Sequence, residues 1–135
     1  MATLFTRIAK GEIPSYKCAE DEHFYAFLDI SPIALGHTLV IPKDVEDDYI
    51  FNLDSKTYEG LWAFAAKVAA AIRAAVPCKR VGVAVLGMEV PHTHIHLVPL
   101  NSEADMDFRK KKVEMTPEDF ARTASAIYEE FVKIN

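Results

Sequence analysis

"PHTHIHLVPL", residues 91–100, is the stretch around which the rest of this 135-residue sequence is best understood. It holds three of the chain's five histidines, at the alternate positions 92, 94 and 96. Apolar residues surround them, and Pro91 stands at the start, where a strand tolerates a proline. Side chains alternate between the two faces of a strand. We therefore expect the three imidazoles on one face and the mostly apolar residues between them on the other.

Such a row of histidines allows three interpretations. A chance group of surface histidines is the plainest, but it explains poorly their strict alternation in a chain that has only two others. A zinc site is the second, because two imidazoles two residues apart can bind one ion, although no Cys, Asp or Glu cluster with ligand spacing completes it. The third is nucleophilic catalysis, in which a neutral imidazole attacks phosphorus and forms a covalent intermediate.

Two residues elsewhere favour catalysis on a nucleotide. His37 opens "HTLVIPK", residues 37–43, which predicts another strand. Asp29 ends the apolar segment "AFLD" just before a loop, where a carboxylate can bind both hydroxyls of a ribose. The same carboxylate could instead cap the turn that contains Ser31, and the sequence leaves these two roles open.

The periodicity along the chain predicts an α+β fold. Residues 54–76 repeat apolar side chains every three or four positions and are rich in alanine, which predicts a long helix. Thr116, Pro117 and Asp119 predict the start of a C-terminal helix. A short helix is expected at 3–11, and strands at 15–21, 24–30, 37–43, 79–87 and 93–100. We expect one domain over residues 1–135, with an antiparallel sheet of about five strands, a long central helix and a C-terminal helix.

Composition and charge narrow the classes of partner. The formal net charge of −5 argues against a nucleic-acid binder. The basic run "RKKK", residues 109–112, is short and lies beside acids, so a solvated loop is favoured over a polyanion contact. No signal-like leader or apolar run of about 20 residues is present, so we expect no membrane partner. Cys18 and Cys78 lack CxxC spacing and are expected to be reduced, in a cytoplasmic protein.

These motifs together resemble the histidine triad (HIT) family, whose signature is His-x-His-x-His followed by apolar residues. "LFTRIAKGEIPS", residues 4–15, is similar to the family's N-terminal segment, and "AFLDISPIALGHTLVIPK", residues 26–43, to its ribose-binding region. The resemblance covers most of residues 4–100. It implies a HIT-like fold and a homodimer whose sheet continues across the interface, which suits the alanine-rich helix.

The resemblance also implies a role for each matching residue. His94, the middle histidine, would be the nucleophile, and the backbone carbonyl of His92 would orient its ring. His96 and His37 would contact the phosphate, and the His92 ring is expected to be a further donor. Asp29 would bind the ribose. The remaining nucleotide-binding positions are a group of apolar residues, for which plain core packing is an equal alternative, and one acid: Phe5, Ile8, Ile13, Phe27 and Glu89.

Three departures from the family pattern concern the substrate. Typical members carry Gly-Gln followed by Ser, Thr or Glu before the triad, whereas this chain has Gly87, Met88 and Glu89. The preceding segment, 79–87, lacks the usual asparagine, and the tail after Leu100 does not match the phosphoramidase branch. The third histidine is retained where uridylyltransferases usually have glutamine, which favours a hydrolase.

We therefore expect a nucleotide hydrolase or nucleotidyl transferase with a purine nucleotide as partner. It would act on the α-phosphate of a nucleoside phosphoramidate or dinucleoside polyphosphate through a nucleotidyl-histidine, without a required metal. Two alternatives remain. One is a non-catalytic nucleotide-binding module, which the lost polar donors suggest, and the other is a zinc-binding protein.

Overall fold

The structure is a computed structural model that describes residues 3–134. It confirms the expected α+β fold, with an antiparallel sheet, a long central helix and a C-terminal helix. Two short 3₁₀ turns, η1 and η2, lie in the connections. The elements in order are α1 (Leu4–Ala9), β1 (Lys17–Glu20), β2 (Phe24–Leu28), β3 (Thr38–Pro42), η1 (Ile50–Asn52), α2 (Ser55–Ala75), β4 (Arg80–Ala84), β5 (Ile95–Leu100), η2 (Glu103–Asp105) and α3 (Pro117–Ile134).

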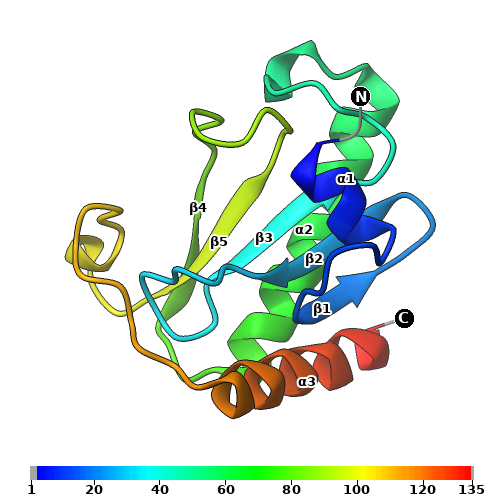
Figure 1. Cartoon of the computed structure of the whole chain (residues 1–135). Coiled ribbons are helices and arrows are strands. Elements are labelled where there is room, and N and C mark those ends of the chain that lie inside the picture. Colours follow the sequence, from blue (N-terminus) through cyan, green and yellow to red (C-terminus); the bar gives the residue numbers. More distant parts are fainter. Residues whose placement is uncertain (1–2, 135) are drawn as a thin grey trace.

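The five strands form one antiparallel sheet in the order β1-β2-β3-β5-β4 (Figure 1). The β3–β5 pair brings together two segments that are far apart in the sequence, so that Thr38 lies opposite Leu97 and Leu39 opposite His96. α3 packs along β1 at one edge. β4 forms the other edge, and Val83 on it is half-exposed.

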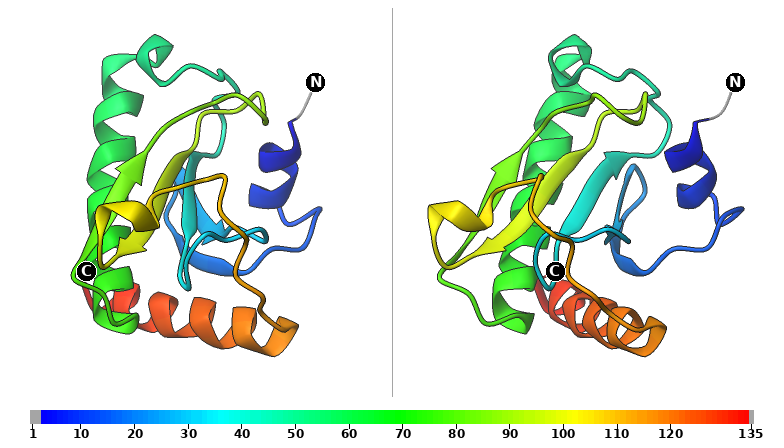
Figure 2. Two further views of the ribbon diagram at one scale, coloured as in Figure 1. Left: turned by 90° about the vertical axis from the view of Figure 1, so that its left-hand side faces the viewer. Right: turned by 60° about the vertical axis from the view of Figure 1, so that its left-hand side comes forward.

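Strand alternation divides the sheet into two differently used faces. In β2, Phe24 and Ala26 belong to the main core with α2 and α3, whereas Tyr25 and Phe27 belong to a second apolar cluster on the opposite face. α1 contributes to that second cluster. Figure 2 shows α1 and α2 on opposite sides of the sheet. The face of the sheet that packs in the main core is thus covered by the long helices α2 and α3. The opposite face, which carries the short helix α1, is left with room for a site.

Local signals begin both long helices where the sequence predicts. The Asp54 side chain accepts a hydrogen bond from the Thr57 N–H at the start of α2. At the start of α3, Thr116 and Asp119 exchange side-chain to backbone bonds of 3.1 Å in each direction, which is a capping box. The stripes Leu61, Phe64, Val68 and Ile72 of α2 and Ala124, Ile127 and Phe131 of α3 are buried in the main core.

The strand that carries the histidines is shorter than expected. β5 begins at Ile95, so that His92 and His94 precede it. The ladder stops there because Thr93 turns away from β3: its N–H and its hydroxyl both donate to the backbone carbonyl of Asp47, at 2.8 and 2.6 Å. The expected alternation nevertheless holds, since Ile95 lies in the main core and His94 on the α1 face. No helix within residues 3–134 is long and apolar enough to cross a membrane.

Candidate active site

A cavity of about 430 Å³ opens on the α1 side of the sheet. This volume lies in the range of about 300–1,000 Å³ that is common for small-ligand sites. The lining of the cavity includes the apolar side chains of Phe5, Ile8 and Phe27 as well as His94 and His96. The segment between β4 and β5 and the segment after η2 form parts of its rim. Three of the predicted histidines, His37, His94 and His96, therefore meet the predicted apolar residues in one cavity.

His94 is held in a single useful tautomer. Its Nδ1 lies 2.8 Å from the backbone carbonyl oxygen of His92, and because a carbonyl only accepts, Nδ1 carries the proton. The neutral ring then has an unprotonated Nε2 with a free lone pair. Phe5 packs edge-on against the ring with centroids 5.1 Å apart, which keeps the imidazole from rotating. His94 lines the cavity.

The His92 ring does not have the role expected for it. Its Nε2 donates to the Pro42 carbonyl at 2.8 Å, and its Nδ1 accepts from the Thr3 hydroxyl at 2.7 Å. Both ring nitrogens are occupied, and the side chain is fully buried. The ring therefore has no hydrogen bond to offer a phosphate. The contribution of His92 is its backbone carbonyl, which orients His94, while its ring ties that backbone to β3 and to the N-cap of α1.

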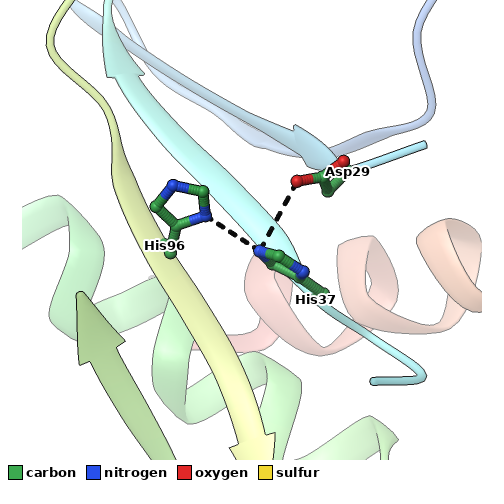
Figure 3. A group of neighbouring side chains, drawn as sticks. All are labelled: Asp29, His37 and His96. Atoms are coloured by element: carbon green, nitrogen blue, oxygen red, sulfur yellow. Dashed lines mark hydrogen bonds and ion pairs between the residues drawn. The ribbon is translucent and has the colours of Figure 1, made fainter. Parts of the chain in front are cut away.

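His37 and His96 form a second, directed pair, shown with Asp29 in Figure 3. The backbone N–H of Ile33 donates to Nδ1 of His37 at 3.1 Å, so that Nδ1 is unprotonated and Nε2 carries the hydrogen. His37 Nε2 lies 2.9 Å from His96 Nδ1 and donates to it. His96 must then carry its proton on Nε2. The Ile33 amide thus sets the tautomer of His37, and His37 in turn sets the tautomer of His96.

Burial keeps this pair uncharged. It lowers the pKa of His37 to about 4, although the Asp29 carboxylate 3.6 Å from its Nε2 opposes the shift. Burial likewise lowers the pKa of His96 to about 3, and the neighbouring His94 and His37 add to the effect. The pKa of His92 is also lowered by burial, against the opposing Pro42 carbonyl. Near neutral pH these rings act as neutral donors and acceptors.

Asp29 caps the turn that the sequence suggested and also lines the cavity. It follows β2 directly, and its Oδ1 accepts from the Ser31 N–H at 2.8 Å, which is the turn cap. Its Oδ2 faces His37, and the residue lines the cavity. Gly36 helps to bring His37 to this place, because its φ of 93° makes a tight turn and an added Cβ would lie 3.0 Å from Val76. One carboxylate oxygen is left directed toward the site.

The predicted base-binding residues lie together. Phe5, Ile8 and Phe27 belong to the apolar cluster on the α1 face, and Ile13 packs against it. All four line the cavity, and Phe5 and Phe27 meet edge to face with centroids 5.4 Å apart. Core packing and cavity lining are therefore not alternatives here. Glu89 also lines the cavity, on the exposed segment between β4 and β5.

Several site residues carry no local signal of their role. Phe108 packs against the His96 ring with centroids 4.8 Å apart, and Lys112 lines the cavity nearby, although both lie in an aperiodic segment. Thr3 was recognisable as a helix cap but not as a partner of His92, 89 residues away. Glu46 accepts from the Thr6 hydroxyl and the Thr3 N–H, and so anchors the same helix start.

Comparisons with known proteins place the chain among its relatives. A family model described as the HIT domain matches residues 10–103. Adenosine 5'-monophosphoramidase HNT1 of Saccharomyces cerevisiae is 33% identical over 114 residues, which cover 76% of this chain and 65% of that protein.

Two solved structures share the fold over nearly the whole chain. A hypothetical histidine triad nucleotide-binding protein from Sulfolobus tokodaii is 30% identical, with a TM-score of 0.78, covering 96% of this chain and 92% of that one. A Zn-bound histidine triad family protein from Mycobacterium smegmatis is 28% identical, with a TM-score of 0.80, covering 99% and 96%. The family model spans more than half of the sequence, and two histidines of the triad it is named for, His94 and His96, line the cavity. The chain therefore belongs to the histidine triad (HIT) family.

Proposed function

We propose that this protein is a nucleotide hydrolase that releases a nucleoside 5'-monophosphate through a nucleotidyl group carried on His94 Nε2. The observation that carries the proposal is the hydrogen bond from His94 Nδ1 to the His92 carbonyl, because it leaves the Nε2 lone pair free in the cavity. A positioned nucleophile with an oriented ring is the arrangement that covalent catalysis needs. The adenosine monophosphoramidase among the relatives supports this reaction class.

The reaction proceeds in two displacements at the α-phosphorus. In the first, the His94 Nε2 lone pair forms an N–P bond while the bond from phosphorus to the leaving group breaks, and the leaving group departs with the electron pair. In the second, a water oxygen attacks phosphorus, the N–P bond breaks, and its electron pair returns to Nε2. The water proton passes to the solvent, and the nucleoside monophosphate is released.

His96 is suited to stabilise the phosphoryl oxygens during both steps. Its Nδ1 accepts from His37, so its Nε2–H is the free donor of a buried, neutral ring. Donors held in place before reaction stabilise developing charge without reorganising. His37 acts through His96 as a positioning residue. In the same scheme, one oxygen of Asp29 accepts from the ribose hydroxyls.

The base is expected to enter between the apolar side chains of α1 and β2. Phe5 and Phe27 are buried aromatic residues that line the cavity, and flat aromatic faces favour a purine. Leu39 of β3 lines the same region. In this proposal the base lies next to α1 and the phosphate next to His94 and His96, and all of these residues line the same cavity.

Release of adenosine monophosphate from adenosine phosphoramidate tests the proposal. Wild-type protein is expected to turn the substrate over, and His94→Ala to lose at least about a thousandfold in kcat because no nucleophile replaces the imidazole. Mass spectrometry of protein that is quenched rapidly without acid should find the nucleotidyl group on the peptide that contains His94, because acid hydrolyses an N–P bond. His23→Ala, in an exposed turn, is the matched control and should keep full activity. Equal turnover by wild type and His94→Ala would refute the nucleophile assignment.

A zinc-binding function is the second candidate, because Asp29, His37 and His96 place one ligand atom each within 4.8 Å of one another. The tautomers argue against it. His37 Nε2 carries the proton that it donates to His96, and moving that proton to Nδ1 would oppose the Ile33 N–H. A ligating imidazole nitrogen must be unprotonated. Elemental analysis of untagged protein should find far less than one zinc per chain; a stoichiometric ion would reverse this preference.

The non-catalytic binding module makes a different prediction from the hydrolase. It would bind nucleotides but leave a panel of phosphoramidates and dinucleoside polyphosphates unchanged, and steady monophosphate release would exclude it.

A homodimer is the expected assembly. β4 is the last strand in the sheet order, and Val83 on it is 48% exposed, so a second copy could extend the sheet there. Light scattering should find a dimer for wild type and a monomer for Val83→Lys. Val132→Lys, at a similarly exposed position of α3, is the control that should stay dimeric. A monomeric wild type would refute the assembly.

A further inference from the structure

The segment after η2 crosses the α1 side of the sheet and forms one wall of the cavity. We call residues 106–113 the strap. Figure 2 shows the chain passing from η2 over this side toward α3. The Phe108 ring contacts both His96 and His37, with centroids 4.8 and 5.9 Å apart, and the Val113 N–H donates to the Pro32 carbonyl at 2.8 Å. The strap is therefore attached to the histidine side of the cavity.

Lys112 is held against this wall. Its Nζ donates to the backbone carbonyl of Phe108 at 2.6 Å, which brings the ammonium group next to the residue that covers His96. Lys112 lines the cavity and its side chain remains exposed to solvent. The basic run at 109–112, which composition alone suggests to be a solvated loop, thus delivers one of its four cations to the site.

The charges around the cavity make this one cation important. Within residues 3–134, Lys112 is the only lysine or arginine that lines the cavity, and two acids, Asp29 and Glu89, line it as well. The buried His37 and His96 are neutral near pH 7. Hydrogen-bond donors are therefore available for an α-phosphate, and among the lysines and arginines of residues 3–134 only Lys112 brings a full positive charge to the cavity lining.

The two kinds of leaving group need different help from the protein. An amine must take up a proton as its bond to phosphorus breaks, whereas a phosphate leaves as an anion and needs only stabilisation of its charge. The segment before the triad offers no side-chain proton donor at Met88, which has only a thioether. A cation on the histidine side of the cavity favours the anionic leaving group.

We propose that Lys112, held by the strap, forms a subsite for the phosphates beyond the α-phosphate, so that the protein prefers nucleoside and dinucleoside polyphosphates over phosphoramidates with neutral or cationic amines. This inference rests on the proposed hydrolase function for the choice of substrate. The contact itself concerns binding, and it can be measured without turnover.

Nucleotide binding is the first test. Dissociation constants for adenosine monophosphate and adenosine α,β-methylene diphosphate, which has no cleavable α,β bond, are compared in EDTA at low salt. Lys112→Gln should weaken binding of the diphosphate analogue about fivefold and that of the monophosphate less than twofold, since an exposed ion pair contributes modestly. Lys112→Arg should retain wild-type binding. Lys111→Gln, in the same run but outside the cavity lining, is the matched control and should change neither constant.

Salt and thermal melts separate a charge effect from a structural one. The difference between the dissociation constants of wild type and Lys112→Gln for the diphosphate analogue should shrink as the salt concentration rises from 20 to 500 mM, because salt screens an exposed charge. The Debye length falls from about 21 Å to about 4 Å over this range. The melting temperatures of the two proteins should agree. Equal weakening of both nucleotides, or no weakening of either, would overturn the subsite.

Turnover is the second test. The ratio of kcat/KM for diadenosine tetraphosphate to that for adenosine phosphoramidate should fall about fivefold in Lys112→Gln. If both substrates are cleaved and the ratio does not change, the subsite is wrong while the hydrolase proposal stands. If wild type cleaves neither substrate, the hydrolase proposal fails, and the analogue binding still decides the role of Lys112.

Discussion

Lowering the pH from 7.5 to 5 should destabilise this protein through its buried histidines. His37 and His96 have pKa values of about 4 and about 3 in the fold, against 6.5 for an ordinary histidine. At pH 5 both are protonated in the unfolded chain and mainly neutral in the folded one. The unfolded state then binds more protons, so the free energy of unfolding falls as the pH falls.

The size of the effect follows from the interval between the ordinary histidine pKa of 6.5 and pH 5. From 6.5 down to 5 there are about 1.5 pH units, and each is equivalent to about 1.36 kcal/mol per group, so each histidine accounts for about 2 kcal/mol and the pair for about 4 kcal/mol. This loss is present at pH 5, keeps growing toward the folded pKa values, and vanishes above about pH 7. His92, whose pKa burial also lowers, acts in the same direction. Carboxylates contribute little in this window, because they titrate mainly below it.

Urea denaturation followed by circular dichroism at pH 7.5, 6 and 5 measures the effect. The double variant His37→Asn, His96→Asn should lose most of the pH dependence, whatever its own stability, with His92 responsible for the remainder. His23→Asn, in the exposed turn between β1 and β2, is the control and should keep the wild-type slope. Equal unfolding free energies at pH 7.5 and 5 in wild type, or a full slope in the double variant, would refute the reasoning.

Three further outcomes test separate parts of the structure. Thr3→Val removes both the α1 cap and the hydroxyl on the His92 ring, so we expect about 1 kcal/mol less stability and a lower kcat, whereas Thr3→Ser should behave as wild type. Burial raises the pKa of the Cys18 thiol to about 12, so a thiol reagent should label Cys78 in the native protein and reach Cys18 only after unfolding; rapid double labelling would contradict this burial. Ile72→Ala should cost about 2–5 kcal/mol in thermal or urea unfolding and Ile72→Val about 1 kcal/mol, and equal costs would argue against tight packing of α2 on the sheet.

The elements of the fold were predictable because their signals are local. Both α2 and α3 show helical periodicity, and each begins at an Asp or Thr cap. In each helix the cap and the residue it bonds are only a few positions apart in the sequence. The early end of β5 was not predictable from the triad. It depends on the backbone carbonyl of Asp47, which accepts hydrogen bonds from Thr93 although the two residues are 46 positions apart in the sequence.

In the site, too, local sequence signals identify the candidate residues, whereas contacts between distant residues decide how these residues are used. The triad, His37 and Asp29 were recognisable as candidates from their residue types and strand positions, and the cavity brings four of the five to its walls. The exception is His92, whose ring is withdrawn by Thr3 and Pro42. The sequence marks His92 as a candidate, but it does not indicate that the backbone carbonyl of this residue, and not its ring, contacts His94.

What this sequence determined by itself is the alternation that puts His94 and His96 on one face of a strand, since a period of two follows from strand geometry alone. What only the tertiary structure decided is which nitrogens carry protons and which charge meets the ligand. The His37–His96 contact joins residues 59 positions apart, and Lys112 reaches the cavity only because the strap crosses the sheet. Such contacts depend on where distant segments pack, and no local spacing records them.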